Sequence, residues 1–239
     1  MLNILKRKKQ ADPFPDITDK TFKQYYDICS EYTMTSVERM YALYNATKYV
    51  IENNIPGDFV ECGVWKGGSS LLIALILKEN SISNRKIYLY DTFEGMSEPT
   101  TNDVDFTGAT AEKQLSDSDI ENQSSVWCYS GMDEVKKNFT DHQIDLKNIE
   151  FVKGKVEETI PQTIPSAIAL LRLDTDWYES TKHEMDHLYP LLENKGVLII
   201  DDYGHWKGCR KAIDEYFESK QIKPLINRID YTGRLIIKT

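Results

Sequence analysis

The sequence has few cysteines, no long apolar run and no excess of positive charge. Its four cysteines, Cys29, Cys62, Cys128 and Cys209, are scattered among 239 residues without a CxxC spacing. We therefore expect reduced thiols, and neither a disulfide framework nor a zinc site. No apolar stretch reaches the length that spans a bilayer, and the first residues lack the apolar core of a signal peptide. These absences predict a cytoplasmic protein with no membrane span.

The charge balance argues against a second class of function. Asp and Glu number 38 against 29 Lys and Arg, which gives a net charge of -9. Proteins that bind nucleic acid usually present a basic face, so we expect no nucleic-acid partner. The one basic run, residues 6–9, is interpreted as a solvated leader rather than as a membrane contact.

The chain is long enough for one α/β domain with additions. We expect a basic leader and linker over 1–20, a helical extension over 21–55 and a Rossmann-like domain over 56–239. Within the extension, Thr35 and Glu38 have the spacing of a capping box, which predicts a helix that starts there and ends near residue 53.

Short apolar runs between turn residues predict a mostly parallel sheet, and a C-terminal hairpin adds one antiparallel strand. The predicted strands are 58–64, 86–92, 149–156, 167–173, 197–200, 225–229 and 234–238. The further predicted helices are 69–77, 132–139, 179–192 and 208–219.

The first predicted strand runs into the glycine-rich turn ECGVWKGGSS. Gly63, Gly67 and Gly68 would allow a ligand to approach the backbone closely. The helix that begins at Ser69 would favour a carboxylate or phosphate at its N-terminus. The spacing is not GxGxxG, so a dinucleotide is poorly supported and a shorter ligand with a carboxylate end fits as well. A plain tight turn is an equally good alternative.

Two further strand ends carry candidate cofactor contacts. Asp91 ends the second strand, where an acid commonly accepts hydrogen bonds from ribose hydroxyls, although a turn aspartate is the alternative. Gly154 and Lys155 follow the third strand, near the place where an adenine would lie. Between these strands, residues 94–125 are polar and long for a loop, which favours a lid over the site, with disorder as the competing interpretation.

Pairs of aspartates end the next two strands. Asp174 and Asp176 follow one strand, and Asp201 and Asp202 follow the other. If the strands are neighbours, four carboxylates converge, and like charges this close require a positive partner such as Mg²⁺. The alternative is turn chemistry, which explains one such residue better than two pairs.

The sequence HEMDH, residues 183–187, matches the HExxH pattern of zinc proteases. We interpret it as a solvated helix face. The motif lies midway along a crossover helix, where it should point away from the carboxyl ends of the strands.

Several blocks in order resemble the macrocin O-methyltransferase family. They are ERMYALYNATKYV, GDFVECGVWKGGSS, YLYDTFEGM, LRLDTDWYEST and IIDDYGHWKGCRKAIDEYF, within a resemblance that runs from about Met34 to the C-terminus. The resemblance implies a class I methyltransferase with a Rossmann-like fold, which uses S-adenosylmethionine and Mg²⁺ to methylate a sugar hydroxyl. It also implies a homo-oligomer.

The resemblance assigns roles to individual residues. It implies that the metal is held by Asp174, Asp201 and Asp202, and that Asp176 is the general base. It implies that S-adenosylmethionine is bound by Glu61, Gly63, Gly68 and Asp91. Where the family often has Gly-Asp-Leu, this chain has Thr175-Asp176-Trp177, a departure that concerns the shape of the acceptor pocket.

The implied chemistry agrees with the residues. A sugar hydroxyl is a poor nucleophile at neutral pH, and Mg²⁺ would lower its pKa and fix its position. Asp176, close to the metal, would accept the proton. Alignment of the hydroxyl with the sulfonium methyl group would supply much of the remaining acceleration. The acceptor is expected to be a sugar, a nucleotide sugar or a glycoside.

Three other functions remain open from the sequence. A glycosyltransferase could use Asp174 and Asp176 as a DxD motif, but this leaves Asp201, Asp202 and the glycine turn without a role. A non-catalytic Rossmann-like binding module would explain the acidic strand ends as turns. A catechol-type O-methyltransferase would chelate Mg²⁺ through two neighbouring oxygens of its acceptor in the same way.

Overall fold

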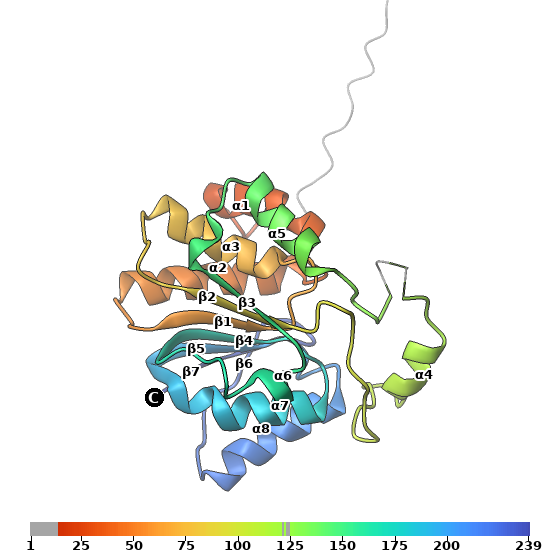
Figure 1. Cartoon of the computed structure of the whole chain (residues 1–239). Coiled ribbons are helices and arrows are strands. Elements are labelled where there is room, and N and C mark those ends of the chain that lie inside the picture. The colour runs from red at the N-terminus through yellow and green to blue at the C-terminus, as the bar shows by residue number, and fades with distance from the viewer. Residues whose placement is uncertain (1–13, 121, 123–124) are drawn as a thin grey trace, which may run out of the picture.

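The computed structural model describes residues 14–120, 122 and 125–239. A central sheet is covered by helices on both faces, and one short helix stands apart from the body (Figure 1). The basic run at 6–9 lies outside the described residues. The first helix of the predicted helical extension starts at Lys20 and packs into the hydrophobic core through Phe22.

Seven strands form the sheet, in the order β3-β2-β1-β4-β5-β7-β6. They are β1 (Asp58–Cys62), β2 (Ile87–Asp91), β3 (Ile149–Lys153), β4 (Ile168–Leu173), β5 (Leu192–Ile200), β6 (Asn227–Arg228) and β7 (Arg234–Ile237). Strands β1 to β5 pair in parallel, whereas β7 runs antiparallel to both of its neighbours. The predicted mostly parallel sheet with one antiparallel C-terminal strand is confirmed.

One layer of helices packs on each face of the sheet (Figure 1). One face carries α1 (Lys20–Cys29), η1 (Ser30–Tyr32), α2 (Val37–Glu52), α3 (Gly68–Glu79) and α5 (Met132–Asp141), with η2 (Leu146–Asn148) leading into β3. The other carries α6 (Val156–Thr159), α7 (Tyr178–His187), η3 (Tyr189–Leu191) and α8 (Lys207–Ser219). In the described part of the chain, no helix is both long enough and apolar enough to cross a membrane.

The predicted start of α2 is wrong by one residue. Ser36, not Thr35, is the N-cap, and its hydroxyl accepts a hydrogen bond from the backbone N–H of Arg39 at 3.2 Å. The Thr35 hydroxyl instead accepts from Nη2 of Arg172, 3.0 Å away. The hydroxyl oxygen of Thr35, predicted to cap the helix, therefore accepts a hydrogen bond from a buried arginine instead.

Three predicted elements in the second half of the chain also have different boundaries. Helix α7 ends at His187 rather than near 192, because the following turn of 3₁₀ helix contains Pro190. Strand β5 therefore starts at Leu192, five residues before the predicted start at 197. The predicted strand at 225–229 is reduced to the two residues of β6.

Gly68, predicted to contact a cofactor, is enclosed by protein. An added Cβ would lie 2.6 Å from the carbonyl oxygen of Tyr32 and 2.8 Å from that of Cys29. The glycine therefore allows the first turn of α3 to pack under the end of α1 and η1.

We expect Gly68→Ala to reduce the free energy of unfolding by about 1–3 kcal/mol because the methyl group overpacks this contact. Helix propensity alone would give the opposite sign, since alanine favours a helix over glycine. Urea unfolding measures the change. Gly131→Ala is the control, because its Cβ would meet nothing within 4 Å. Equal or greater stability of Gly68→Ala would contradict the packing role.

Candidate active site

A cavity of about 550 Å³ opens where the parallel strands end. A smaller hollow of about 50 Å³ adjoins it, and the two share Gly63, Asp91 and Asp174 among their lining residues. They form one cleft at the carboxyl edge of the sheet, the edge at which α/β proteins bind their ligands.

The cleft contains a cluster of three carboxylates. Oxygen atoms of Asp174, Asp176 and Asp202 all lie within 4.8 Å of one another. They meet because β4 and β5 are neighbours and end in register, with Leu173 opposite Ile200. The predicted convergence of the two acidic pairs is therefore present for three of the four side chains.

The environment of this cluster disfavours its negative charge. Burial raises the pKa of Asp176 to about 7. Burial and the neighbouring carboxylates also raise the pKa of Asp174 and of Asp202. Oδ2 of Asp202 is buried without a hydrogen-bond partner. Oxygen ligands, like charges and an unpaired buried oxygen suit a divalent cation such as Mg²⁺.

Asp201 lies beside this cluster but is held by arginines. Nη2 of Arg172 is 2.6 Å from Oδ1 of Asp201, and Arg39 of α2 pairs with Oδ2. Of the residues predicted to hold the metal, the structure thus brings Asp174 and Asp202 together, with Asp176 as their third neighbour. The assignment of Asp201 as a ligand stays a prediction.

Arg172 is the residue that the sequence analysis missed. Its guanidinium is 2 % exposed and bonds Glu61 at 2.7 Å, Asp174 at 2.7 Å and Asp201 at 2.6 Å. Such a buried charge is tolerated only with partners of opposite sign. The signal was present in the sequence, because an arginine interrupts the otherwise apolar strand at 168–173.

Glu61, predicted to bind the cofactor, faces the interior. It is 1 % exposed, and besides Arg172 it accepts a hydrogen bond from the hydroxyl of Ser70. It does not line either part of the cleft. The structure gives Glu61 a part in balancing the charge of Arg172, and its contact with a cofactor stays a prediction.

The turn after β1 is held by Asp91. Oδ2 of Asp91 accepts from the backbone N–H of Val64 at 2.7 Å and of Trp65 at 3.2 Å, and Oδ1 accepts from Phe93 at 2.6 Å. The Thr92 hydroxyl lies 3.5 Å from Oδ1 but only 2.5 Å from the carbonyl oxygen of Gly95, which takes its one proton, so one lone pair of Oδ1 remains for a ligand. Because Asp91 lines both parts of the cleft, it can brace the turn and face a ligand at once.

The remaining predicted cofactor residues divide between cleft and core. Gly63 and Ser69 line the larger part, and Gly154 and Lys155 line the smaller part. Gly67 does not line it, since its Cβ position, like that of Gly68, is filled by protein, here Val135 and Phe139. Gly63 has φ +81 and lies so close to the backbone of Asp174 that any side chain would collide.

The HEMDH motif is only partly solvated. Glu184 is fully buried and accepts a hydrogen bond from the Thr175 hydroxyl, with its two oxygens 3.0 and 3.2 Å away. Met185 is buried as well. The predicted solvated face is therefore wrong for these two residues, and Glu184 points toward the acidic loop rather than away from it.

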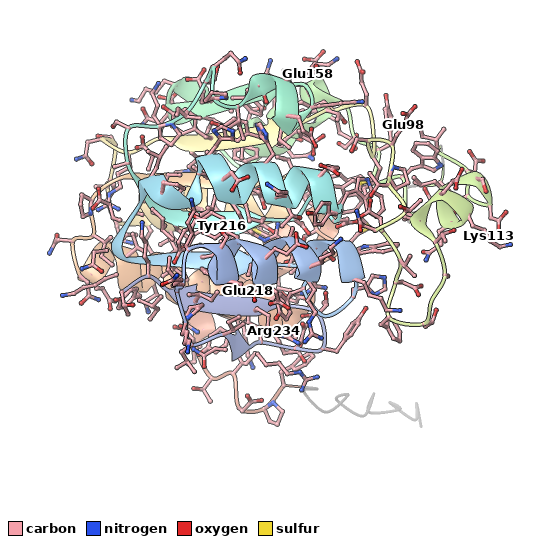
Figure 2. The ribbon with its side chains drawn as sticks, turned by 90° about the horizontal axis from the view of Figure 1, so that it is seen from below. Glu98, Lys113, Glu158, Tyr216, Glu218 and Arg234 are labelled. Atoms are coloured by element: carbon pink, nitrogen blue, oxygen red, sulfur yellow. The ribbon has the colours of Figure 1, made fainter. Side chains whose placement is uncertain are left out.

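The segment predicted to be a lid passes beside the cleft. Met96, Gln114 and Ser125 line the larger part. Its helix α4 (Ala111–Ser116) stands away from the sheet, with Lys113 directed outward (Figure 2). Asp103 fixes the segment to α7, because its carboxylate accepts from the backbone N–H of Tyr178 at 2.7 Å. Movement as a lid stays a prediction.

Replacement of Arg172 by methionine should destabilise the protein by about 3–5 kcal/mol, because three buried or half-buried carboxylates lose their shared cation. Thermal or urea unfolding at neutral pH measures this loss. The control is Arg210→Met, which removes an exposed pair with Asp214 and should have little effect. Equal stability of the two variants would show that the buried network contributes nothing.

The sequence and the fold both match known methyltransferases. The family model described as macrocin O-methyltransferase (TylF) matches residues 15–238. Demethyldecarbamoylnovobiocin O-methyltransferase from Streptomyces niveus is 32 % identical over 84 % of this chain and 74 % of its own. A Streptomyces olivaceus 4'-O-methyltransferase, whose named substrate is a rhamnosyl tetracenomycin, is 31 % identical over the same shares.

Solved structures agree with this match. The structure of the O-methyltransferase NovP is 30 % identical, with a TM-score of 0.76 over 87 % of this chain and 82 % of that one. The calicheamicin methyltransferase CalS11, at 17 % identity and a TM-score of 0.58, shares the fold over 96 % of this chain and 94 % of its own. The chain is thus an O-methyltransferase that belongs to the macrocin O-methyltransferase family.

Proposed function

We propose that this protein transfers a methyl group from S-adenosylmethionine to a hydroxyl of a sugar or glycosylated small molecule, with Mg²⁺ bound at the acidic cluster. The observation that carries the proposal is the position of Asp174, Asp176 and Asp202 in one cleft with the Asp91-braced turn. The relatives' named substrates, which include novobiocin and tetracenomycin precursors, support a glycoside acceptor.

The turn after β1 and the end of β2 would bind the cofactor. S-adenosylmethionine would supply a methyl group that its sulfonium already activates. Asp91 would accept hydrogen bonds from the ribose, and the N-terminus of α3 near Ser69 would favour the methionine carboxylate. Gly154 and Lys155, which line the smaller part, would lie beside the adenine.

Asp174 and Asp202 would hold the metal, which would lower the pKa of the acceptor hydroxyl. Asp201 is paired with Arg39 through one oxygen and with Arg172 through the other, so to join them it would have to bind the ion and an arginine through the same oxygen. In the absence of a metal ion, the two arginines balance the negative charge of Asp201.

Asp176 would accept the proton of the hydroxyl. Its carboxylate lies in the acidic cluster and lines the larger part of the cleft. Its backbone has φ 68, in the left-handed region, so the chain turns sharply to aim this side chain into the cleft. A fixed base at the reacting hydroxyl typically contributes a factor of about 10²–10⁴ to the rate.

A glycosyltransferase with a DxD motif is less well supported. It would use Asp174 and Asp176 but has no role for Asp202 or for the Asp91-braced turn. The family match also favours methyl transfer.

The cofactor is tested by calorimetry with S-adenosylhomocysteine. We expect saturable binding at one site, weakened at least tenfold by Asp91→Ala, since both the ribose contact and the brace of the turn are lost. Leu225→Ala, a change at an exposed residue that does not line the cleft, should leave binding unaltered. A wild-type protein that does not bind S-adenosylhomocysteine but binds a nucleotide sugar would favour the glycosyltransferase.

Two neighbouring substitutions separate the metal site from the base. Asp174→Asn should lose Mg²⁺ binding, measured by calorimetry on chelator-treated protein. Asp176→Asn should retain Mg²⁺ and S-adenosylhomocysteine binding but lose about 10²–10⁴ of turnover. Retained turnover in Asp176→Asn would remove this residue as the base, and loss of Mg²⁺ binding in the same variant would make it a ligand.

A further inference from the structure

Three aromatic rings form a cluster at the mouth of the cleft. The rings of Phe106 and His205 lie 5.4 Å apart, those of Phe106 and Tyr231 6.1 Å, and those of His205 and Tyr231 6.0 Å. His205 and Tyr231 line the larger part of the cleft, so the cluster continues its wall. We call these three residues the aromatic platform.

Two rings of the platform are exposed to an unusual degree. Phe106 is 58 % and Tyr231 is 54 % exposed. An isolated exposed ring needs no explanation, but two that meet beside an active-site cleft are typical of a ligand surface.

Phe106 is held in this exposed position by a rigid loop. The carboxylate of Asp105 accepts from the backbone N–H groups of Thr107 at 2.8 Å, Gly108 at 2.9 Å and Ala109 at 3.0 Å. Asp105 also forms a β-bridge with Trp206, next to His205. The hydrogen bond from the Thr107 hydroxyl and those from the backbone lower the pKa of Asp105 to about 2, so this brace persists at neutral pH.

The polar groups of two of these rings pair with each other. The hydroxyl of Tyr231 lies 3.0 Å from Nδ1 of His205, within hydrogen-bond distance. More than half of Phe106 and of Tyr231 stays exposed, so both rings are open to an apolar partner.

The cleft behind the platform is unsuited to a phosphorylated acceptor. Five aspartates and two arginines line the larger part, and each arginine is paired with carboxylates. The smaller part adds one lysine and one glutamate, Lys155 and Glu157. Acidic residues of the whole lining thus outnumber basic ones by six to three, and both arginines are already paired, so a diphosphate would meet few cations that are free to bind it.

We propose that the aromatic platform holds an uncharged ring joined to the sugar that is methylated, and that Phe106 and Tyr231 thereby determine which acceptors the enzyme prefers. The ring is the planar part of an aglycone or the C–H face of a second sugar, because both stack on aromatic side chains. This inference rests on the proposed function and specifies its acceptor.

The test compares acceptors that share one sugar and differ in the attached group. Protein loaded with S-adenosylhomocysteine and Mg²⁺ is titrated with 4-nitrophenyl rhamnoside, a rhamnosyl disaccharide, methyl rhamnoside and dTDP-rhamnose. The same series is made with glucose and with fucose. In at least one series, the nitrophenyl glycoside or the disaccharide should bind about tenfold tighter than the methyl glycoside, and the nucleotide sugar more weakly than either.

The platform variants assign that preference to its residues. Phe106→Ala and Tyr231→Ala should bring the ratio of the two affinities close to one. Leu225→Ala, which also removes an exposed apolar side chain but lies off the cleft, should keep the ratio of the wild type. Binding of S-adenosylhomocysteine to each variant shows that it is folded.

The outcomes distinguish a failure of the aromatic platform from a failure of the proposed methyl transfer. Tightest binding of the nucleotide sugar, equal binding of all neutral glycosides, or an unchanged ratio in Phe106→Ala would each overturn the platform while S-adenosylhomocysteine still binds. Failure of wild-type protein to bind S-adenosylhomocysteine would instead overturn the proposed methyl transfer.

Discussion

The charge of one buried guanidinium organises the catalytic edge of this protein. Arg172 lies in the middle of the sheet, on β4, and its partners come from β1 through Glu61, from its own strand end through Asp174 and from β5 through Asp201. It also donates a hydrogen bond to the hydroxyl of Thr35, just before α2. Since a charge in this position is stable only when each partner is in place, folding and assembly of the site are one event.

The acidic side chains near Arg172 fall into two groups, those that pair with it and those that only face the cleft. Asp201 and Glu61 have an internal cation, whereas Asp176 and Asp202 form no ion pair within the described residues and lie close enough to repel each other. The carboxylates that neutralise Arg172 are therefore distinct from those that only face the cleft, and Asp174 belongs to both groups. Burial and the neighbouring carboxylates raise the pKa of Asp174 and of Asp202, so a positive ligand in the cleft would stabilise their charged forms.

Much of this could be predicted from the sequence, for physical reasons that are visible in particular residues. Apolar runs located the parallel strands, and the rule that such strands share a carboxyl edge brought Asp174, Asp176 and Asp202 together. What failed depends on tertiary contacts. The Thr35 hydroxyl accepts from Arg172, which is 137 residues away, instead of capping α2, and the buried carboxyl of Glu184 accepts from Thr175 in the loop before α7. The pattern of apolar and polar residues does not predict which arginines will form ion pairs with Asp201.

The two ion pairs of Arg39 limit how far the chain can be shortened from its N-terminal side. Arg39 belongs to the helical extension, yet it pairs with Asp201 after β5 and with Asp230 before β7. A shortened protein that began at residue 56 would keep every strand of the sheet, but Asp230 would lose its cation and Asp201 would be left with Arg172 alone. The extension is thus a component of the catalytic unit rather than a detachable appendage, and the smallest autonomous fragment has to include it.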